Sequence, residues 1–123
     1  YLDMDWHTIT KPFNGKVNDF EKTAMANIHL IKEIVPRYRS TYFSHIFAGG
    51  YASGYYSYVW AEVLDADAFQ AFKETSLFDK ATATRFREEV LSKGGTRDPM
   101  VLFKNFRGRA PKPDAYMKKK GLK

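Results

Sequence analysis

A histidine, a glycine pair and a cluster of tyrosines stand together in the middle of this 123-residue chain. His45 precedes Gly49 and Gly50, and four of the eight tyrosines fall within residues 51–58. A phenol donates a hydrogen bond and stays protonated at neutral pH, and an imidazole can also donate one. Side chains of these types suit a site that binds or polarises a carbonyl oxygen.

The spacing of three tyrosines predicts that they share one face of a helix. Tyr51, Tyr55 and Tyr58 are separated by four and then three residues, which is the repeat of a helical face. The opposite arc of this helix would be apolar and comprises Tyr56, Val59, Trp60, Val63 and Leu64. Because aromatic stripes at helical spacing are also typical of a buried core, the tyrosine face has two interpretations, a core face or a binding face.

The glycines around this cluster predict a flexible loop, which we call the glycine loop (residues 45–54). Gly49 and Gly50 can adopt backbone conformations that are closed to other residues. Their surroundings do not match a phosphate-binding loop or a dinucleotide fingerprint, so a hinge or a close approach to a bound peptide is expected instead. His45 in this loop is either a substrate contact or an ordinary packing histidine.

Helices separated by short loops account for the rest of the chain, which predicts an all-α fold. Residues 1–17 show weak periodicity and are expected to form an irregular arm. A helix over residues 18–35 would begin with a capping box of Asn18 and Glu21 and end at Pro36.

Further helices are predicted over residues 51–64 and after Asp79, with a short helix after Asp65 or Asp67. Asp98 followed by Pro99 marks the start of a helix that ends before Gly108. A last short helix is expected over residues 114–120. The 123 residues form a single segment in this interpretation, with residues 18–123 helical apart from the loops.

Composition restricts the classes of protein to which the chain can belong. A content of 44% hydrophobic and 16% aromatic residues argues against disorder, and no cysteine is present to form a disulfide or a reactive thiolate. No apolar run reaches the length of a membrane-spanning helix. The net charge is +6, and many cations lie in the last twenty residues. They could bind nucleic acid, but a solvated surface is favoured because no nucleic-acid motif accompanies them.

Metal ligation by the N-terminal residues has little support from the sequence. Asp3, Asp5 and His7 alternate in two-residue steps, as on an extended arm, but nothing nearby completes a coordination shell. The chain also contains no His-Glu-x-x-His motif and no serine nucleophile motif.

The segment from Tyr42 to Leu64 resembles the thimet-oligopeptidase family of zinc metallopeptidases, most closely its bacterial oligopeptidase A and peptidyl-dipeptidase type. Its sequence is Tyr-Phe-Ser-His-Ile-Phe-Ala-Gly-Gly-Tyr-Ala-Ser-Gly-Tyr-Tyr-Ser-Tyr-Val-Trp-Ala-Glu-Val-Leu. The likeness continues through residues 86–95, 102–111 and 120–122. It therefore covers most of the chain.

The resemblance implies that this chain is the helical C-terminal part of a larger peptidase catalytic domain with a deep substrate channel. Zinc in that family is held by a His-Glu-x-x-His helix and a further glutamate, and these elements precede the segment that this chain matches. The resemblance therefore implies a zinc-dependent parent protein that hydrolyses short peptides. This chain alone would bind no zinc and would be inactive.

The family's substrate groups map onto residues of this chain. The resemblance implies that His45 hydrogen-bonds the substrate backbone and that Tyr58 stabilises the oxyanion of the tetrahedral intermediate. The other implied substrate contacts are Tyr51, Tyr55, Gly49 and Gly50. The glycine loop would close over the bound peptide.

The expected partners are short peptides, with no nucleic acid and no membrane, in a cytoplasmic parent protein. The chain alone is expected to self-associate because faces meant for the missing half would be exposed. An alternative of another class is a stand-alone helical module that binds peptides without cleaving them. Dipeptide release and internal cleavage are equally compatible with these residues.

Overall fold

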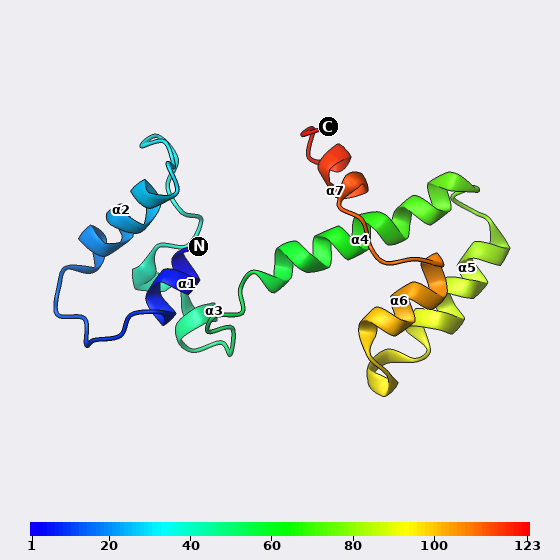
Figure 1. Cartoon of the computed structure of the whole chain (residues 1–123), viewed down its shortest axis with the longest axis horizontal. Coiled ribbons are helices and arrows are strands. Elements are labelled where there is room, and N and C mark those ends of the chain that lie inside the picture. Colours follow the sequence, from blue (N-terminus) through cyan, green and yellow to red (C-terminus); the bar gives the residue numbers. More distant parts are fainter. The chain divides into compact units, whose positions relative to one another are not determined.

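The computed structural model describes residues 1–123, and every regular element in it is a helix (Figure 1). The expected all-α class is confirmed. The chain divides into two compact units, Tyr1–Ser57 and Tyr58–Lys123. None of the helices is both long and apolar enough to cross a membrane.

The first unit is built from short helices around a small core. These are α1 (Leu2–His7), α2 (Val17–Asn27), the 3-10 turn η1 (Ser40–Tyr42) and α3 (Ser44–Phe47). The core consists of Leu2, Ala24, Phe43 and Ile46, with Trp6, Phe20, Met25, Tyr38 and Tyr55 packed against it. The irregular arm expected over residues 1–17 therefore contains a helix, which forms because burial of Leu2 and Trp6 outweighs the weak local signal.

The helix predicted over residues 18–35 is shorter than expected and begins differently. It ends at Asn27 because His29 takes a left-handed conformation, with φ of 56°. The backbone N–H of Leu30 then donates to the carbonyl of Met25 at 3.1 Å, which completes a Schellman-type stop. His29 accordingly lies beyond the helix. The expected capping box is also wrong, since Lys16 is the N-cap and no side chain caps the helix.

Glu21 has a different role, as the buried anion of the first unit. Its side chain is 4% exposed and forms an ion pair with Arg39. It also accepts hydrogen bonds from the backbone N–H of Ser40 at 2.8 Å and from the Ser40 hydroxyl at 3.0 Å. Burial raises the pKa of the Glu21 carboxyl, but the hydrogen bonds from Ser40 and Arg39 outweigh burial and bring the pKa below its usual value.

Replacing Glu21 by glutamine is expected to destabilise the first unit by about 1.5–3 kcal/mol at pH 7, since hydrogen bonds to a charged acceptor are lost. Because the pKa of Glu21 is lower in the folded state, its ionised carboxylate stabilises the fold at pH values above its unfolded-state pKa of about 4.3. This stabilisation is lost as the pH falls through the pKa of the folded state. The difference between variant and wild type should therefore shrink on acidification. The difference in the free energy of unfolding is measured by urea unfolding at pH 7 and pH 3. The NMR signal of the Trp6 indole, which donates to the Ser40 hydroxyl at 2.9 Å, reports on the first unit. A constant difference would contradict this role.

The predicted tyrosine helix is displaced along the chain. Helix α4 runs from Ser57 to Glu74, and residues 52–56 form turns. Of the three tyrosines assigned to one helical face, only Tyr58 is helical, so the shared face is wrong. The helix also continues without a break through Asp65 and Asp67, where a second helix was expected to start.

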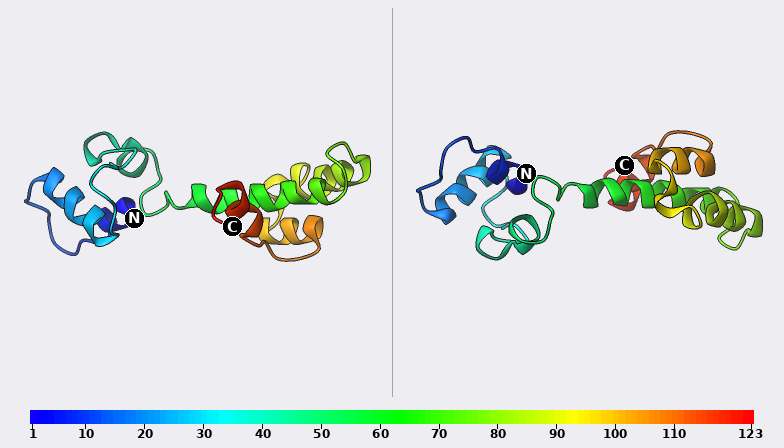
Figure 2. Two further views of the ribbon diagram at one scale, coloured as in Figure 1. Left: turned by 90° about the horizontal axis from the view of Figure 1, so that it is seen from above. Right: turned by 90° about the horizontal axis from the view of Figure 1, so that it is seen from below.

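The second unit contains four α-helices, and phenylalanine side chains join three of them. It contains α4, α5 (Lys80–Phe86), the π-turn η2 (Arg87–Leu91), the 3-10 turn η3 (Gly94–Thr96), α6 (Pro99–Arg107) and α7 (Asp114–Lys119). In both views of Figure 2, α5 and α6 lie along the C-terminal half of α4. Phe86 and Phe106 join the two helices, with ring centroids 5.0 Å apart, and Phe72 of α4 contacts both rings.

The predicted starts of α5 and α6 are confirmed. The Asp79 side chain accepts from the Thr82 N–H at 2.7 Å, and the Asp98 side chain accepts from the Met100 N–H at 2.7 Å. Helix α6 ends at Gly108 in the left-handed conformation that glycine favours, with φ of 72°. The last helix, α7, lies where it was expected.

A buried aspartate of α4 links that helix to α6 and to the segment that follows α6. The Asp67 side chain is 2% exposed and accepts two hydrogen bonds of 2.7 Å from Arg109. Arg107 lies 3.3 Å away, and the backbone N–H of Lys112 donates at 2.8 Å. Burial raises the pKa of Asp67, but the hydrogen bonds from Arg109 and Lys112 and the charges of both arginines outweigh it, so the pKa is lowered. Some of the cations near the C-terminal end are thus paired within the unit.

Candidate functional site

His45 lies in α3 inside a group of aromatic rings. The centroid of its imidazole is 5.0 Å from that of Tyr38, 5.6 Å from that of Tyr55 and 6.2 Å from that of Tyr51. The Nδ1 atom is buried and has no hydrogen-bond partner in the protein. A buried polar atom without a partner costs about 1–3 kcal/mol, and such atoms in native proteins call for an explanation.

The two glycines after His45 are required for different reasons. A Cβ atom on Gly49 would lie 2.9 Å from the His45 Cα and 3.0 Å from its carbonyl oxygen, which is too close. Gly50 has φ of 78°, a conformation that side-chain-bearing residues rarely adopt. The backbone N–H of Tyr51 then donates to the His45 carbonyl at 3.0 Å. The glycine pair therefore folds Tyr51 back onto His45.

The structure brings His45, Tyr51 and Tyr55 together within the first unit. Tyr51 is 37% exposed, whereas the Tyr55 ring packs against the core at 4.8 Å from Phe43. Tyr58 belongs to the other unit, where it is 44% exposed in the first turn of α4. The cluster therefore arises from a turn and an aromatic core, and the periodicity of one helix has no part in it.

Two neighbours of this cluster were not predicted from the sequence as members of the site. Tyr38 stacks on Phe43, with centroids 5.2 Å apart, and its ring lies next to the His45 ring at a tilt of 52°. Asp3 accepts hydrogen bonds from the backbone of Ser53 and Tyr55. Sequence spacing carried no signal for either, because both contacts are tertiary.

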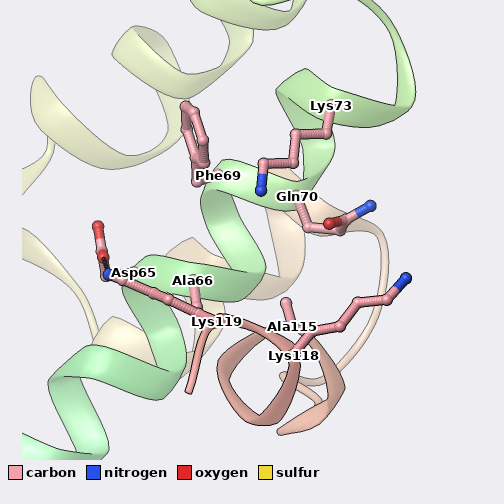
Figure 3. A pocket seen from close by; sticks show the side chains of 8 residues that line it. All are labelled: Asp65, Ala66, Phe69, Gln70, Lys73, Ala115, Lys118 and Lys119. Carbon is pink, nitrogen blue, oxygen red and sulfur yellow. Dashed lines mark hydrogen bonds and ion pairs between the residues drawn. The ribbon is translucent and has the colours of Figure 1, made fainter. Parts of the chain in front are cut away.

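A separate groove lies between α4 and α7 in the second unit. Figure 3 shows the Lys73 and Lys118 side chains at its edge, with Phe69 on the α4 side. The remaining lining residues are Asp65, Ala66, Gln70, Ala115 and Lys119. None of the predicted site residues lines this groove.

The acidic and imidazole side chains of this chain do not fit a zinc site. No three of its histidine, aspartate and glutamate side chains gather where they could hold a metal ion. Asp3, Asp5 and His7 lie on α1, where Asp3 and His7 bond to each other and the backbone. We therefore assign no step of the reaction to a metal held by these residues.

Comparison with known proteins identifies the class to which this arrangement belongs. The profile of peptidase family M3 matches residues 1–122. The chain belongs to this family of peptidases, and the expected family resemblance is confirmed.

Relatives from bacteria and plants share this region. The chain is 45% identical to "Oligopeptidase A" of Haemophilus influenzae over 116 residues, which is 94% of this chain and 17% of that protein. It is 55% identical to "Probable cytosolic oligopeptidase A" of Arabidopsis thaliana over 126 aligned positions, covering 98% of this chain and 18% of that protein. For "Dipeptidyl carboxypeptidase" of Escherichia coli the identity is 42%, again over 98% of this chain and 18% of the relative. The chain thus spans less than a fifth of each of these relatives.

Proposed function

We propose that this chain is the substrate-binding part of a zinc-dependent peptidase that hydrolyses peptide bonds in short peptides. Membership of peptidase family M3 supports the reaction, and the names of the relatives, oligopeptidase A and dipeptidyl carboxypeptidase, support peptides as substrates. The zinc site is assigned to other parts of the protein. We place the parent protein in the cytoplasm, as the name of the Arabidopsis relative states for that protein.

The observation that carries the proposal is the environment of His45. Its imidazole has a nitrogen without a partner, and the glycine pair brings the backbone N–H of Tyr51 to the backbone carbonyl of His45. A peptide backbone offers carbonyl oxygens, which accept from an imidazole N–H once the ring rotates toward them. His45 and Tyr51 would hold the peptide in this way, with Tyr55 supporting them from the core side.

The proposed role of Tyr58 is electrostatic. When water adds to the scissile carbonyl and loses a proton to a base, the carbonyl oxygen becomes an oxyanion. When this oxyanion collapses, the C–N bond breaks and the leaving amine takes the proton from the base. A phenol that donates to this oxygen stabilises the transition state more than the substrate. The exposure of Tyr58 at the start of α4 is compatible with such a contact.

The exposed apolar residues of α4 support the proposal that this chain functions as part of a larger domain. Val59 and Trp60 are 56% and 51% exposed, although the spacing predicted a packing face. Exposed apolar patches of this kind mark interfaces.

Replacing His45 by alanine in the full-length protein is expected to raise KM about tenfold or more, since a hydrogen bond to the bound substrate is lost, with a smaller effect on kcat. Steady-state cleavage of a short peptide, followed by chromatography of the products, measures both constants. His45→Gln, which keeps an N–H donor, should recover part of the affinity. His29→Asn is the control because His29 is exposed and asparagine tolerates its left-handed backbone. An unchanged KM in His45→Ala would remove His45 from the substrate site.

A further inference from the structure

The carboxylate of Asp3 is buried and connects α1 to the glycine loop. Asp3 is 4% exposed. Its Oδ1 atom accepts from the backbone N–H of Ser53 at 2.9 Å, and its Oδ2 atom accepts from the backbone N–H of Tyr55 at 2.9 Å. Both oxygens of one side chain are therefore bound to backbone that lies fifty residues further along the chain.

His7 contacts the same carboxylate from within α1. The His7 Nδ1 atom lies 2.9 Å from Asp3 Oδ1 and 2.8 Å from the Asp3 carbonyl oxygen. Both oxygens are acceptors, so Nδ1 carries the proton and donates it. This contact fixes the side chain of Asp3 on α1, one helical turn before His7.

The bound backbone has an unusual conformation that an anion stabilises. Ser53 has φ of 56°, in the left-handed region that a residue with a side chain rarely occupies. Backbone N–H groups that converge around such a residue form a concave site for an anion. Asp3 supplies that anion from within the protein, and its charge strengthens both hydrogen bonds.

Hydrogen bonds carry this constraint from Ser53 and Tyr55 to the candidate substrate contacts. The backbone N–H of Gly54, between the two residues that Asp3 binds, donates to the Tyr51 carbonyl at 2.9 Å. The N–H of Tyr51 donates in turn to the His45 carbonyl at 3.0 Å. The carboxylate thus acts on His45 and Tyr51 through the backbone of the loop.

We infer that Asp3 is a positioning residue that sets the shape of the glycine loop for peptide binding. The inference rests on the proposed function in one respect, the identity of the ligand. The anchoring of the loop by the Asp3 carboxylate follows from its hydrogen bonds with Ser53 and Tyr55 and does not depend on the ligand.

The test replaces Asp3 by asparagine in the full-length protein, with Asp5→Asn as the matched control on the same helix. Asparagine keeps one acceptor oxygen, but its NH₂ group then faces a backbone N–H. We expect amide hydrogen exchange of residues 50–56 to become about tenfold faster or more, because a charged acceptor is lost. KM for a short peptide should rise about 10- to 100-fold through misplacement of the binding groups. Asp5→Asn should behave as the wild type.

The two readouts separate positioning from a merely structural role. A loss of folded protein lowers the apparent kcat and leaves KM unchanged, whereas a misplaced loop raises KM. Unchanged exchange in the loop, or a fall of kcat alone, would overturn the inference. If Asp3→Asn does not fold, His7→Ala takes its place, and loop exchange in that variant must still be faster than in the wild type.

The experiment also distinguishes this inference from the proposed function. Wild-type protein that cleaves no peptide would refute the function, while the hydrogen exchange would still report on the anchor. If the wild-type protein cleaves peptides but Asp3→Asn changes neither the hydrogen exchange of the loop nor KM, the positioning role of Asp3 is refuted. The proposed function then remains intact.

Discussion

Replacing Tyr58 by phenylalanine in the full-length protein is expected to lower kcat about 100- to 1000-fold and to leave KM nearly unchanged. The phenol would donate to an oxyanion that exists only after water has added to the carbonyl. Removing such a donor costs transition-state stabilisation without weakening substrate binding. Steady-state kinetics with a short peptide measures both constants for the variant and the wild type.

Tyr56 provides the matched control for this experiment. It lies two residues before Tyr58, is 68% exposed and has no proposed contact with the substrate. Tyr56→Phe should therefore keep wild-type kinetics. Parallel changes of kcat and KM in Tyr58→Phe would instead make Tyr58 an ordinary binding or packing residue.

The largest expected effect on stability comes from Asp67. Replacing it by alanine leaves Arg107, whose side chain is 6% exposed, and Arg109 without their shared carboxylate. Breaking a buried ion pair by removing one partner costs about 3–5 kcal/mol, because an uncompensated charge stays buried. Arg107 keeps its contacts with Glu74 at 2.9 and 3.1 Å, but Glu74 is half-exposed and replaces the lost anion only in part. Denaturant unfolding at neutral pH measures the difference in the free energy of unfolding between Asp67→Ala and the wild type.

Asp65 is the control for the change at Asp67. It lies on the same helix and pairs with Lys119 at 3.2 Å, but both side chains are more than half exposed. Exposed ion pairs contribute about 0–1 kcal/mol. Asp65→Ala should therefore unfold almost as the wild type does. Similar losses in the two variants would show that burial of Asp67 has no special energetic role.

Elements with local signals were predictable from the sequence. The carboxylates of Asp79 and Asp98 cap the helices that follow them, and Gly108 ends α6, because each of these devices acts within one helical turn. The all-α class followed from the same signals.

Elements controlled by tertiary contacts were not predictable in this way. Tyr51 and Tyr55 match a helical repeat, but the hydrogen bonds from Ser53 and Tyr55 to Asp3 hold this segment in turns. No spacing rule connects Asp3 with a loop fifty residues away. The helix predicted through residue 35 fails for a similar reason, since its C-terminal apolar residues Ile31, Ile34 and Val35 are more than half exposed and gain nothing from helical packing.

The grouping of His45 and Tyr51 was expected, but for another reason than the one the structure gives. A tight turn at the glycine pair brings them together, and Tyr38 and Tyr55 enclose the imidazole. The sequence supplied the residue types of the candidate site, and tertiary packing supplied its geometry.

The binding of a transition-state analogue tests the central claim most directly, namely that this chain supplies the oxyanion donor of a peptidase. The probe is a short peptide with a phosphinate in place of the scissile amide, which presents a tetrahedral centre with a negative oxygen. Inhibition constants are measured for wild-type full-length protein and for Tyr58→Phe. The proposed role predicts that the variant binds the phosphinate more weakly by the same factor by which its kcat/KM falls. Equal affinity of the two proteins for the phosphinate would contradict it.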